Sequence, residues 1–166
     1  MWCLKPLQFL LRALTSDNSA GQLAAAFSLG LLIGLVPKGN LLAAGLMLIL
    51  CVFRVNLGLG LLAAFVFSWI GVLLDPAADR LGYWLLTMPS LQPFWSQFFN
   101  MPVAPWTALN NSVVLGNFLI GLVLAGISYF WLKPILARHA ARWMAYLQRY
   151  RIVKVLWGLS VVSKVA

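Results

Sequence analysis

The stretch AGQLAAAFSLGLLIGLV-PKGN-LLAAGLMLILCVF, residues 20–53, sets a short polar break between two apolar segments. As a helix, residues 20–36 would be about 25 Å long, slightly shorter than a hydrocarbon core of about 30 Å. Residues 41–53 would reach only about 20 Å, which is too short to cross comfortably. We therefore favour a re-entrant helical hairpin over residues 20–54, with residues 37–40 at its tip inside the membrane. The alternative is two tilted transmembrane helices joined by an exposed turn.

The composition indicates a membrane protein. Hydrophobic residues make up 63% of the 166-residue chain and charged residues only 9%, whereas a soluble domain carries roughly 25% charged residues. Too few charges remain to cover a soluble surface, and the mean hydropathy of +0.92 agrees. A bilayer tolerates this composition, and the length allows one membrane domain without a separate soluble module.

Two further apolar segments, residues 57–74 and 112–132, are long enough to cross a bilayer as helices. Residues 77–111 between them are rich in aromatic side chains and prolines. Proline at this density prevents one long helix, and Trp and Tyr favour the headgroup level. This region therefore predicts short helices that form an interfacial segment or a second re-entrant hairpin. We expect Asp75-Pro76 to start a helix, with Asp75 as its cap.

Both ends of the chain carry positive charge. Residues 1–19 predict a short amphipathic helix, whose polar end can cap the helix that follows. Residues 133–166 predict a basic amphipathic helix in the membrane interface, with these interfacial side chains: Arg138, Arg142, Trp143 and Arg149. Because Lys and Arg gather at both ends, the positive-inside rule places both termini in the cytoplasm and requires an even number of full crossings.

The predicted fold is an all-α integral membrane protein with two full transmembrane helices, re-entrant helical hairpins and a basic amphipathic C-terminal helix. The alternative is four transmembrane helices. The membrane domain would cover residues 20–132, and Asn117 is expected to hydrogen-bond a neighbouring helix. Close helix packing is expected at four small residues: Gly30, Gly34, Gly116 and Gly121.

The polar break supplies the first candidate binding site. Pro37 ends the first helix, Lys38 offers a point charge, and Gly39 lets the backbone approach a ligand. Exposed amide groups of the helix after Asn40 would add positive potential. A lysine at membrane depth is costly and usually functional. These residues predict a site for a lipid phosphate group, and the structural alternative is an ordinary turn.

Two other groups of polar residues are candidates. Arg54 and Asn56 follow the second apolar segment. One interpretation is an arginine at the membrane interface together with a residue that ends the helix. The other is that Arg54 pairs with a charge on the substrate or on an aspartate. Asp75, Asp79 and Arg80 follow the third apolar segment. Helix capping is the favoured interpretation of Asp75, and a proton-carrying or charge-pairing role is the sharper alternative.

The sequence does not contain the residue patterns that a metal site, an enzyme active site or a nucleic-acid-binding surface needs. His139 has no Cys, Glu or second His nearby in the sequence, so no metal site is predicted. No Ser/His/Asp or Cys/His set offers nucleophilic catalysis, so we expect neither enzymatic activity nor a cofactor. The net charge of +9 favours basic flanks lying against anionic lipid over binding to nucleic acid.

Three pieces of the chain resemble a bacterial protein family. They read LAAAFSLGLLIGLVPKGN at 23–40, FRVNLGLG at 53–60 and LLDPAADRLGYWLL at 73–86. In order and spacing they are similar to small inner-membrane proteins defined by a domain of unknown function. Two later pieces match a narrower subgroup, LQPFWSQFFNMPVAPW at 91–106 and LNNSVVLGNFLIG at 109–121.

This family distantly resembles the DedA/VTT superfamily, whose members have two facing re-entrant hairpins and are linked to the movement of lipids between leaflets. The resemblance implies a first hairpin at residues 22–54 and a second within residues 77–111. The better-known members carry an acidic residue near the first hairpin tip. In this sequence Lys38 and Asn40 stand there instead.

We therefore expect a bacterial inner-membrane protein that supports transport or transbilayer movement of phospholipid or another anionic lipid, alone or in an envelope complex. Its expected partners are membrane lipids, with a larger envelope protein or a second copy of the chain as further ones. The first alternative is a non-transporting anchor or assembly subunit of an envelope complex. The second is a small-ion or solute transporter, which would need a membrane carboxylate such as Asp75 or Asp79.

Overall fold

A computed structural model of the chain describes residues 18–147. In this range the chain forms five α-helices and two short 3-10 helices, in this order: α2 (Ala20–Leu35), α3 (Leu41–Val52), α4 (Leu57–Thr87), η2 (Pro89–Leu91), α5 (Gln92–Phe99), η3 (Ala104–Thr107) and α6 (Ser112–Leu147). No strand occurs between residues 18 and 147, which agrees with the predicted all-α class. The predicted helix at residues 1–19 and the end of the predicted basic tail fall mostly outside the described residues.

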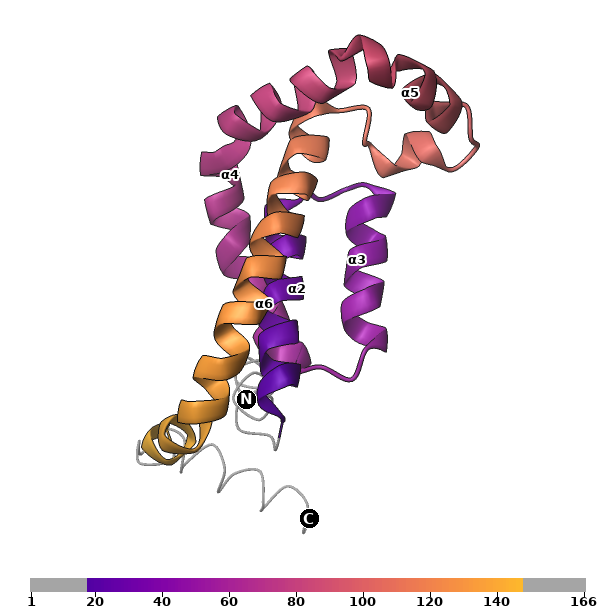
Figure 1. Ribbon diagram of the computed structural model, residues 1–166. Coiled ribbons are helices and arrows are strands. Elements are labelled where there is room, and N and C mark those ends of the chain that lie inside the picture. Colours follow the sequence, from indigo (N-terminus) through magenta and orange to yellow (C-terminus); the bar gives the residue numbers. More distant parts are fainter. Residues whose placement is uncertain (1–17, 148–166) are drawn as a thin grey trace.

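The long helices lie side by side, and the short ones gather at one end. Helices α2, α4 and α6 all pack on one another, while α3 runs antiparallel to α2 and stands apart from α4 and α6 (Figure 1). Helix α5 and the 3-10 helices lie at the end where α4 finishes and α6 begins. The amino end of α2 and the carboxyl end of α6 lie together at the other end of the molecule, away from α5 (Figure 1).

Polar side chains mark the start of each long helix. Ser19 and Gln22 form a capping box, with side-chain to backbone distances of 3.2 and 2.9 Å. The side chains of Asn40, Asn56 and Asn111 accept hydrogen bonds from first-turn N–H groups of α3, α4 and α6. Each such bond satisfies a donor that has no partner within its own helix. The cap expected before α2 is confirmed.

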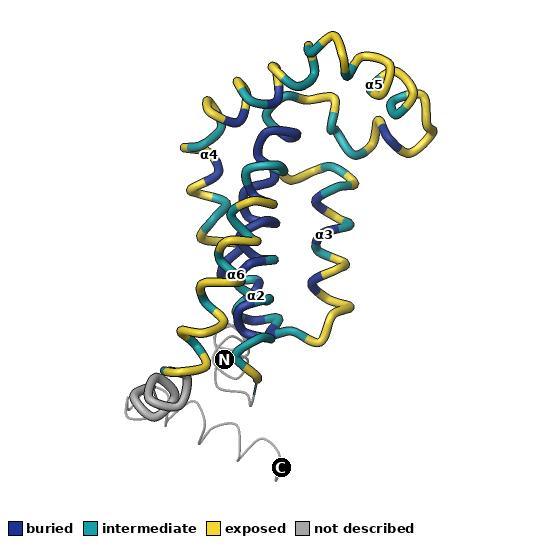
Figure 2. The backbone as a smooth tube through the Cα atoms, in the orientation of Figure 1, coloured by how far each residue is buried: buried dark blue, intermediate teal, exposed yellow. Residues whose placement is uncertain are grey.

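Helix α2 forms the core although it is one of the shorter helices. Ala24, Ala26 and Ile33 are fully buried, and Figure 2 shows α2 as the most continuously buried helix. A Cβ atom added at Gly30 or Gly34 would collide with backbone atoms of α4. The absence of side chains at these two positions allows α2 and α4 to approach closely, as small residues do between membrane helices.

The second close contact joins α4 to α6. A Cβ atom at Gly82 would overlap the backbone of Ser112, and one at Gly116 would overlap the backbone of Ala78. Gly121 lies against Leu32 of α2. The glycines predicted to permit helix packing, in α2 and α6, thus all lie where two helices touch.

The outer faces of α4 and α6 are apolar. Both helices are long and apolar enough to span a membrane, by length and composition. Large hydrophobic side chains on them are strongly exposed, with Leu73 at 79% and Phe130 at 74%. Contiguous apolar surface of this kind is costly in water and favourable against lipid. The described residues therefore support a membrane protein.

The prediction that Asp75-Pro76 starts a helix is wrong. Pro76 lies inside α4, which continues to Thr87 and changes direction in its second half (Figure 1). Proline lacks the N–H that would bond the carbonyl group of Val72, so the helix loses one hydrogen bond there. Contacts of the following turns with α6 hold the helix together across this defect.

Two predicted boundaries also change. Residues 77–87 belong to α4, so the predicted second hairpin region, 77–111, begins inside a long helix. The rest of that region consists of short helices, as expected. Likewise, α6 runs through Pro134 to Leu147, so residue 132 does not separate a span from an independent tail helix. Helix α6 nevertheless changes direction near its carboxyl end (Figure 1).

Candidate functional site

The turn at Pro37–Asn40 is a tightly specified connection between α2 and α3. The Asn40 side chain donates a hydrogen bond to the carbonyl oxygen of Pro37 and accepts one from the N–H of Ala43, both at 2.8 Å. Gly39 has a φ of 92°, a left-handed conformation that glycine adopts readily and other residues do not. The polar break predicted from the sequence is therefore a closed turn that fixes the direction of α3.

Replacement of Gly39 by alanine is expected to lower the free energy of unfolding by about 1–2 kcal/mol. No atom lies within 4 Å of a Cβ atom built at Gly39, so the cost comes from the backbone conformation alone. Gly45 in α3 has equally open surroundings and a helical backbone, so Gly45→Ala is the matched control. Thermal unfolding of both variants in detergent measures the difference. Equal melting temperatures for the two variants would contradict the assignment.

The side chain of Lys38 folds back onto the carboxyl end of α2. Its Nζ donates hydrogen bonds to three carbonyl oxygens, those of Ile33 (2.6 Å), Gly34 (3.0 Å) and Val36 (2.6 Å). Pro37 has no N–H to offer the carbonyl of Ile33, and the ammonium group supplies that missing donor. A positive charge here also opposes the partial negative charge of the helix end.

These bonds change the role predicted for Lys38. An ammonium group has three N–H donors, and all three end on backbone carbonyls. Lys38 lies in the turn, outside the two helices that are long enough to span a membrane. Its ammonium group is partly buried, and this burial lowers its pKa. An anion at this site would feel the charge of Lys38 and would take hydrogen bonds from the first-turn N–H groups of α3 at Leu41 and Leu42.

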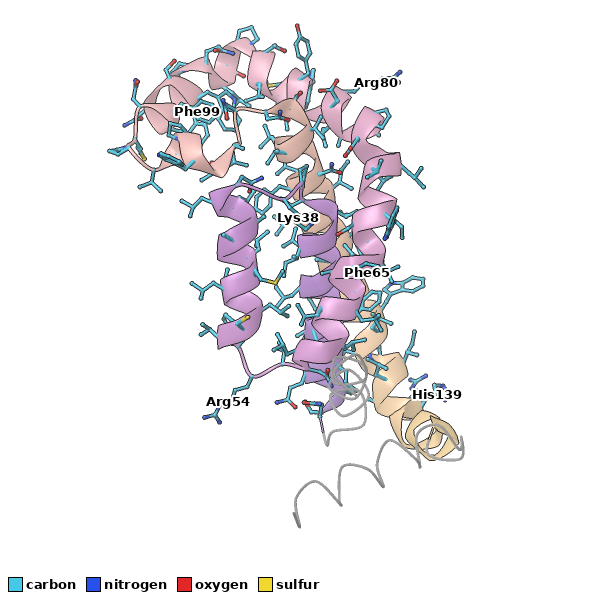
Figure 3. The ribbon with its side chains drawn as sticks, turned by 180° about the vertical axis from the view of Figure 1, so that it is seen from behind. Lys38, Arg54, Phe65, Arg80, Phe99 and His139 are labelled. Carbon is cyan, nitrogen blue, oxygen red and sulfur yellow. The ribbon has the colours of Figure 1, made fainter. Side chains whose placement is uncertain are left out.

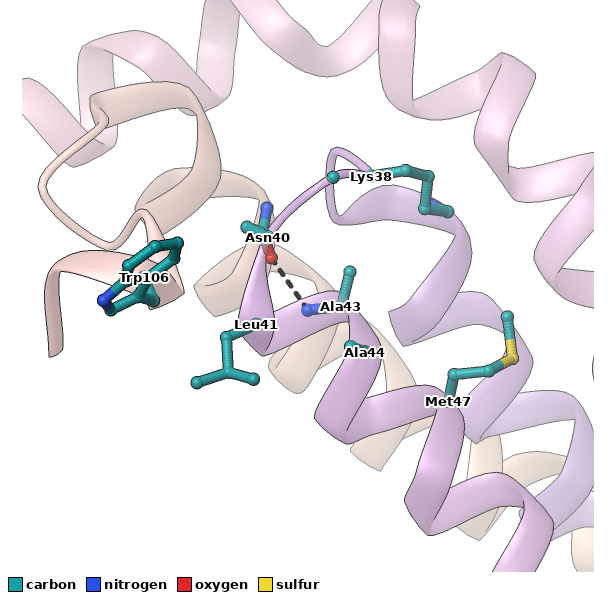
Figure 4. A pocket seen from close by; sticks show the side chains of 8 residues that line it. Lys38, Asn40, Leu41, Ala43, Ala44, Met47 and Trp106 are labelled. Atoms are coloured by element: carbon teal, nitrogen blue, oxygen red, sulfur yellow. Dashed lines mark hydrogen bonds between the residues drawn. The ribbon is translucent and has the colours of Figure 1, made fainter. Parts of the chain in front are cut away.

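A cavity of about 660 Å³, which we name the turn cavity, opens between this turn, the first half of α3 and η3. Lys38, Gly39 and Asn40 form its polar side. Its apolar wall comes from α3 and from Trp106 of η3, which lies across from the start of α3 (Figure 4). A cavity with a positive polar side and an apolar wall fits an anionic amphiphile.

A second cavity, of about 230 Å³, lies on the other side of Lys38, between the end of α2 and α4. Asp75 and Ser68 of α4 line it together with Lys38. The Ser68 hydroxyl donates a hydrogen bond to the carbonyl of Ala64 at 2.7 Å. The structure thus brings Lys38 and Asp75 to the walls of one cavity, although the sequence placed them in separate candidate sites.

The carboxylates of α4 are bonded to α6. Asp75 Oδ1 accepts a hydrogen bond from the Asn117 side-chain amide at 2.6 Å, and Asp79 Oδ1 accepts one from the hydroxyl of Ser112. The interhelical hydrogen bond expected of Asn117 is confirmed. Asp75 therefore links two helices and does not cap one, while a proton-carrying role for either carboxylate stays a prediction. Arg80 is exposed and points away from the core (Figure 3).

Arg54 lies at the opposite end of α3 from Lys38 (Figure 3). Asn56 stands two residues later, directly before α4. Arg54 is exposed in the connection between α3 and α4. Asn56 is buried and accepts a hydrogen bond from the N–H of Leu59 at 2.9 Å, so it begins α4. The structure does not bring these two residues to the turn cavity. Asn56 instead caps the amino end of α4.

The remaining predicted residues lie in or beyond α6. Arg138 is exposed on α6. Arg142 and Trp143 belong to the last part of that helix, and Arg149 lies outside the described residues. Between residues 18 and 147 no three His, Cys, Asp or Glu side chains come together as a metal site would require. Trp106 was not predicted as a site residue, and its only signal was its place in an aromatic, proline-rich segment.

Most of the chain is similar in sequence to other bacterial proteins. Residues 6–144 match the family model described as "Uncharacterized protein conserved in bacteria (DUF2062)". An uncharacterized protein of Treponema pallidum (strain Nichols) is 31% identical over 126 residues, which is 76% of this chain and 75% of that relative. No solved structure matches the chain, and the distant similarity to the DedA/VTT superfamily stays a prediction. The turn, both cavities beside Lys38 and the core helices all fall within the matched residues, and the chain belongs to the DUF2062 family of bacterial proteins.

Proposed function

We propose that this protein is an inner-membrane protein that binds an anionic phospholipid at the Pro37–Asn40 turn and supports its movement between the leaflets. The turn cavity carries this proposal. Its volume of about 660 Å³ lies between a polar side that contains Lys38 and an apolar wall that contains Trp106. A lipid phosphate is favoured by the amino end of α3 and by the lysine charge, while the apolar wall suits the start of the acyl chains.

Helix lengths support a position of the turn at the headgroup level. The apolar part of α4, residues 57–74, would rise about 27 Å, close to a hydrocarbon core of about 30 Å. Asp75 follows directly and lines a cavity together with Lys38, so the turn is level with the far end of this apolar part. Exposed Trp84 and Trp106 belong to the same end, and tryptophan favours headgroups. The proposal therefore adopts the four-helix alternative, with α2 rising about 24 Å and the shorter α3 about 18 Å.

The direction of the helices supports the proposed topology. The amino end of α2 and the carboxyl end of α6 lie at the same end of the molecule (Figure 1). Most Lys and Arg residues stand near the two termini of the sequence. By the positive-inside rule this end faces the cytoplasm, and the turn cavity then opens toward the outer leaflet.

Reconstitution of the full chain tests the proposal. Vesicles of phosphatidylethanolamine and phosphatidylglycerol would carry a trace of phosphatidylglycerol with a fluorescent acyl chain. A membrane-impermeant reductant bleaches only the outer leaflet of protein-free vesicles. With the protein present we expect the inner-leaflet probe to be bleached as well, because it reaches the outer leaflet. Bleaching that stops at the outer leaflet, as in empty vesicles, would refute the proposal.

Two tryptophans provide a matched pair of variants. Trp106 lines the turn cavity and Trp131 lies on α6, and both side chains are 73% exposed. Trp106→Ala is expected to slow lipid movement several-fold because the cavity loses its apolar wall, whereas Trp131→Ala is expected to leave the rate unchanged. Equal rates for the two variants would mean that the cavity does not carry the lipid. The assembly-subunit and solute-transporter alternatives stay predictions.

A further inference from the structure

The second cavity, of about 230 Å³ between the end of α2 and α4, contains a charged acceptor that is only partly used. Asp75 accepts a hydrogen bond from the Asn117 amide through Oδ1. Its other oxygen, Oδ2, accepts no hydrogen bond from the described residues and is not sealed from the surface, since Asp75 is only partly buried. Lys38 lines the same cavity, but all three of its N–H donors end on backbone carbonyls. Asp75 Oδ2 is therefore available to a hydrogen-bond donor from a ligand.

The carbonyl group of Leu35 adds a second unused acceptor. Lys38 bonds three other carbonyl groups at the end of α2, whereas the Leu35 oxygen accepts no hydrogen bond within the described part of the chain. This oxygen faces α4, because a Cβ atom built at Gly71 would lie 3.2 Å from it. Leu35 and Gly71 both line the second cavity. The cavity thus offers acceptors and requires donors from its occupant.

The turn cavity and the second cavity have opposite hydrogen-bonding character. The turn cavity offers the first-turn N–H groups of α3 at Leu41 and Leu42, which suit a phosphate group. Lys38 forms part of both walls, and its side chain extends from the turn away from Trp106 (Figure 4). A ligand that lies along Lys38 with its phosphate in the turn cavity therefore presents its next chemical group to the acceptors of the second cavity.

The charge of Lys38 decides which donor fits that position. A hydroxyl group donates a hydrogen bond to Asp75 Oδ2 without adding charge. An ammonium group would also donate, but it would place a second positive charge beside the ammonium group of Lys38, and like charges repel. A neutral headgroup that carries hydroxyl groups therefore suits the second cavity better than a cationic one.

We infer that the second cavity binds the part of a phospholipid headgroup beyond the phosphate, and that a headgroup hydroxyl donates a hydrogen bond to Asp75 Oδ2. This inference rests on the proposed function, because it takes the position of the phosphate from the turn cavity. It narrows the substrate class to anionic phospholipids with a polyol headgroup. Phosphatidylglycerol belongs to this class, whereas phosphatidic acid carries nothing beyond its phosphate.

Native mass spectrometry of the full chain in detergent tests the inference. Phosphatidylglycerol and phosphatidylpropanol with the same acyl chains would be added at equal concentrations. Both headgroups have three carbons and a singly charged phosphate, but only the glycerol headgroup carries hydroxyl groups. The two complexes differ by the mass of two oxygen atoms, so the spectrum separates them. We expect phosphatidylglycerol to bind about tenfold better, the factor for one hydrogen bond to a charged acceptor.

Two variants locate the preference. Asp75→Asn should abolish it, because an NH₂ group replaces the acceptor Oδ2 while the remaining oxygen still accepts the Asn117 amide. Asp79→Asn is the matched control. Asp79 also bonds α6, through Ser112, but does not line the second cavity, so this variant should keep the tenfold preference. Both variants remove one unit of negative charge, so an effect of overall charge would appear in both.

Equal binding of phosphatidylglycerol and phosphatidylpropanol to the unmodified protein would overturn the inference, and this comparison needs no variant to fold. An unchanged preference in Asp75→Asn would also overturn it, as would stronger binding of phosphatidylethanolamine, whose ammonium group would then be the favoured donor. Mass spectrometry reports binding and requires no transport. Absence of lipid movement in vesicles together with an intact preference would overturn only the proposed function. Lipid movement without any such preference would overturn only the role of Asp75.

Discussion

Replacement of Gly116 by alanine is expected to lower the free energy of unfolding by about 3 kcal/mol, a large effect for one added methyl group. The added Cβ atom would overlap the backbone carbonyl of Ala78. A backbone atom cannot rotate aside as a flexible side chain can, so α4 and α6 would have to separate. This separation would also stretch the hydrogen bond between Asp75 and Asn117, which lies directly beside the contact.

Gly126→Ala is the control for this prediction because it makes the same chemical change in the same helix. Open space surrounds a Cβ atom at Gly126, and alanine favours a helix over glycine by about 1 kcal/mol, so the control should melt at an equal or higher temperature. Circular dichroism in detergent micelles measures both variants. Gly82→Ala, which meets the backbone of Ser112, should behave like Gly116→Ala. A stable Gly116→Ala variant would show that α4 and α6 are not in this close contact.

Replacement of Lys38 by methionine is expected to have two separable effects. The carbonyl groups of Ile33, Gly34 and Val36 lose their donor, so stability should fall by about 1–2 kcal/mol. The turn cavity also loses its positive charge. The preference for phosphatidylglycerol over neutral phosphatidylcholine should therefore weaken, and the rates at which fluorescent forms of the two lipids move between leaflets measure that preference.

Arg54→Met tests whether the position of the charge matters. It removes the same unit of charge from the exposed connection at the other end of α3. We expect its melting temperature and its lipid preference to match those of the unmodified protein. An equal loss of lipid preference in both variants would show that overall charge attracts the lipid and that the turn cavity does not. An unchanged melting temperature for Lys38→Met would contradict its role as the cap of α2.

The role of Lys38 as a helix cap could have been predicted from the sequence. Pro37 removes the backbone donor that the Ile33 carbonyl would otherwise use, and a long cationic side chain follows at the next position. Both facts are local. The charge of Lys38 and its expected depth indicate a ligand site, whereas the carbonyl groups left without a donor at the end of the preceding helix indicate a cap.

Pro76 shows the opposite case, where a sound local rule fails. Asp followed by Pro is a typical helix start, yet α4 continues through both residues. The side chains of Asp75 and Asp79 bond partners on α6, and Ala78 packs on Gly116 between them. No local pattern contains this information, because the stabilising partners lie more than thirty residues later in the chain.

Residue type and spacing within a few turns are enough to predict the all-α class, the apolar segments, the cap before α2 and the glycines at helix contacts. Only the packing of segments that are distant in the sequence places Lys38 in one cavity with Asp75 and in another with Trp106. These features depend on how closely three helices approach one another. The polar break at residues 37–40 is thus both a helix cap, set by neighbouring residues, and one wall of a binding cavity, set by the packing of distant ones.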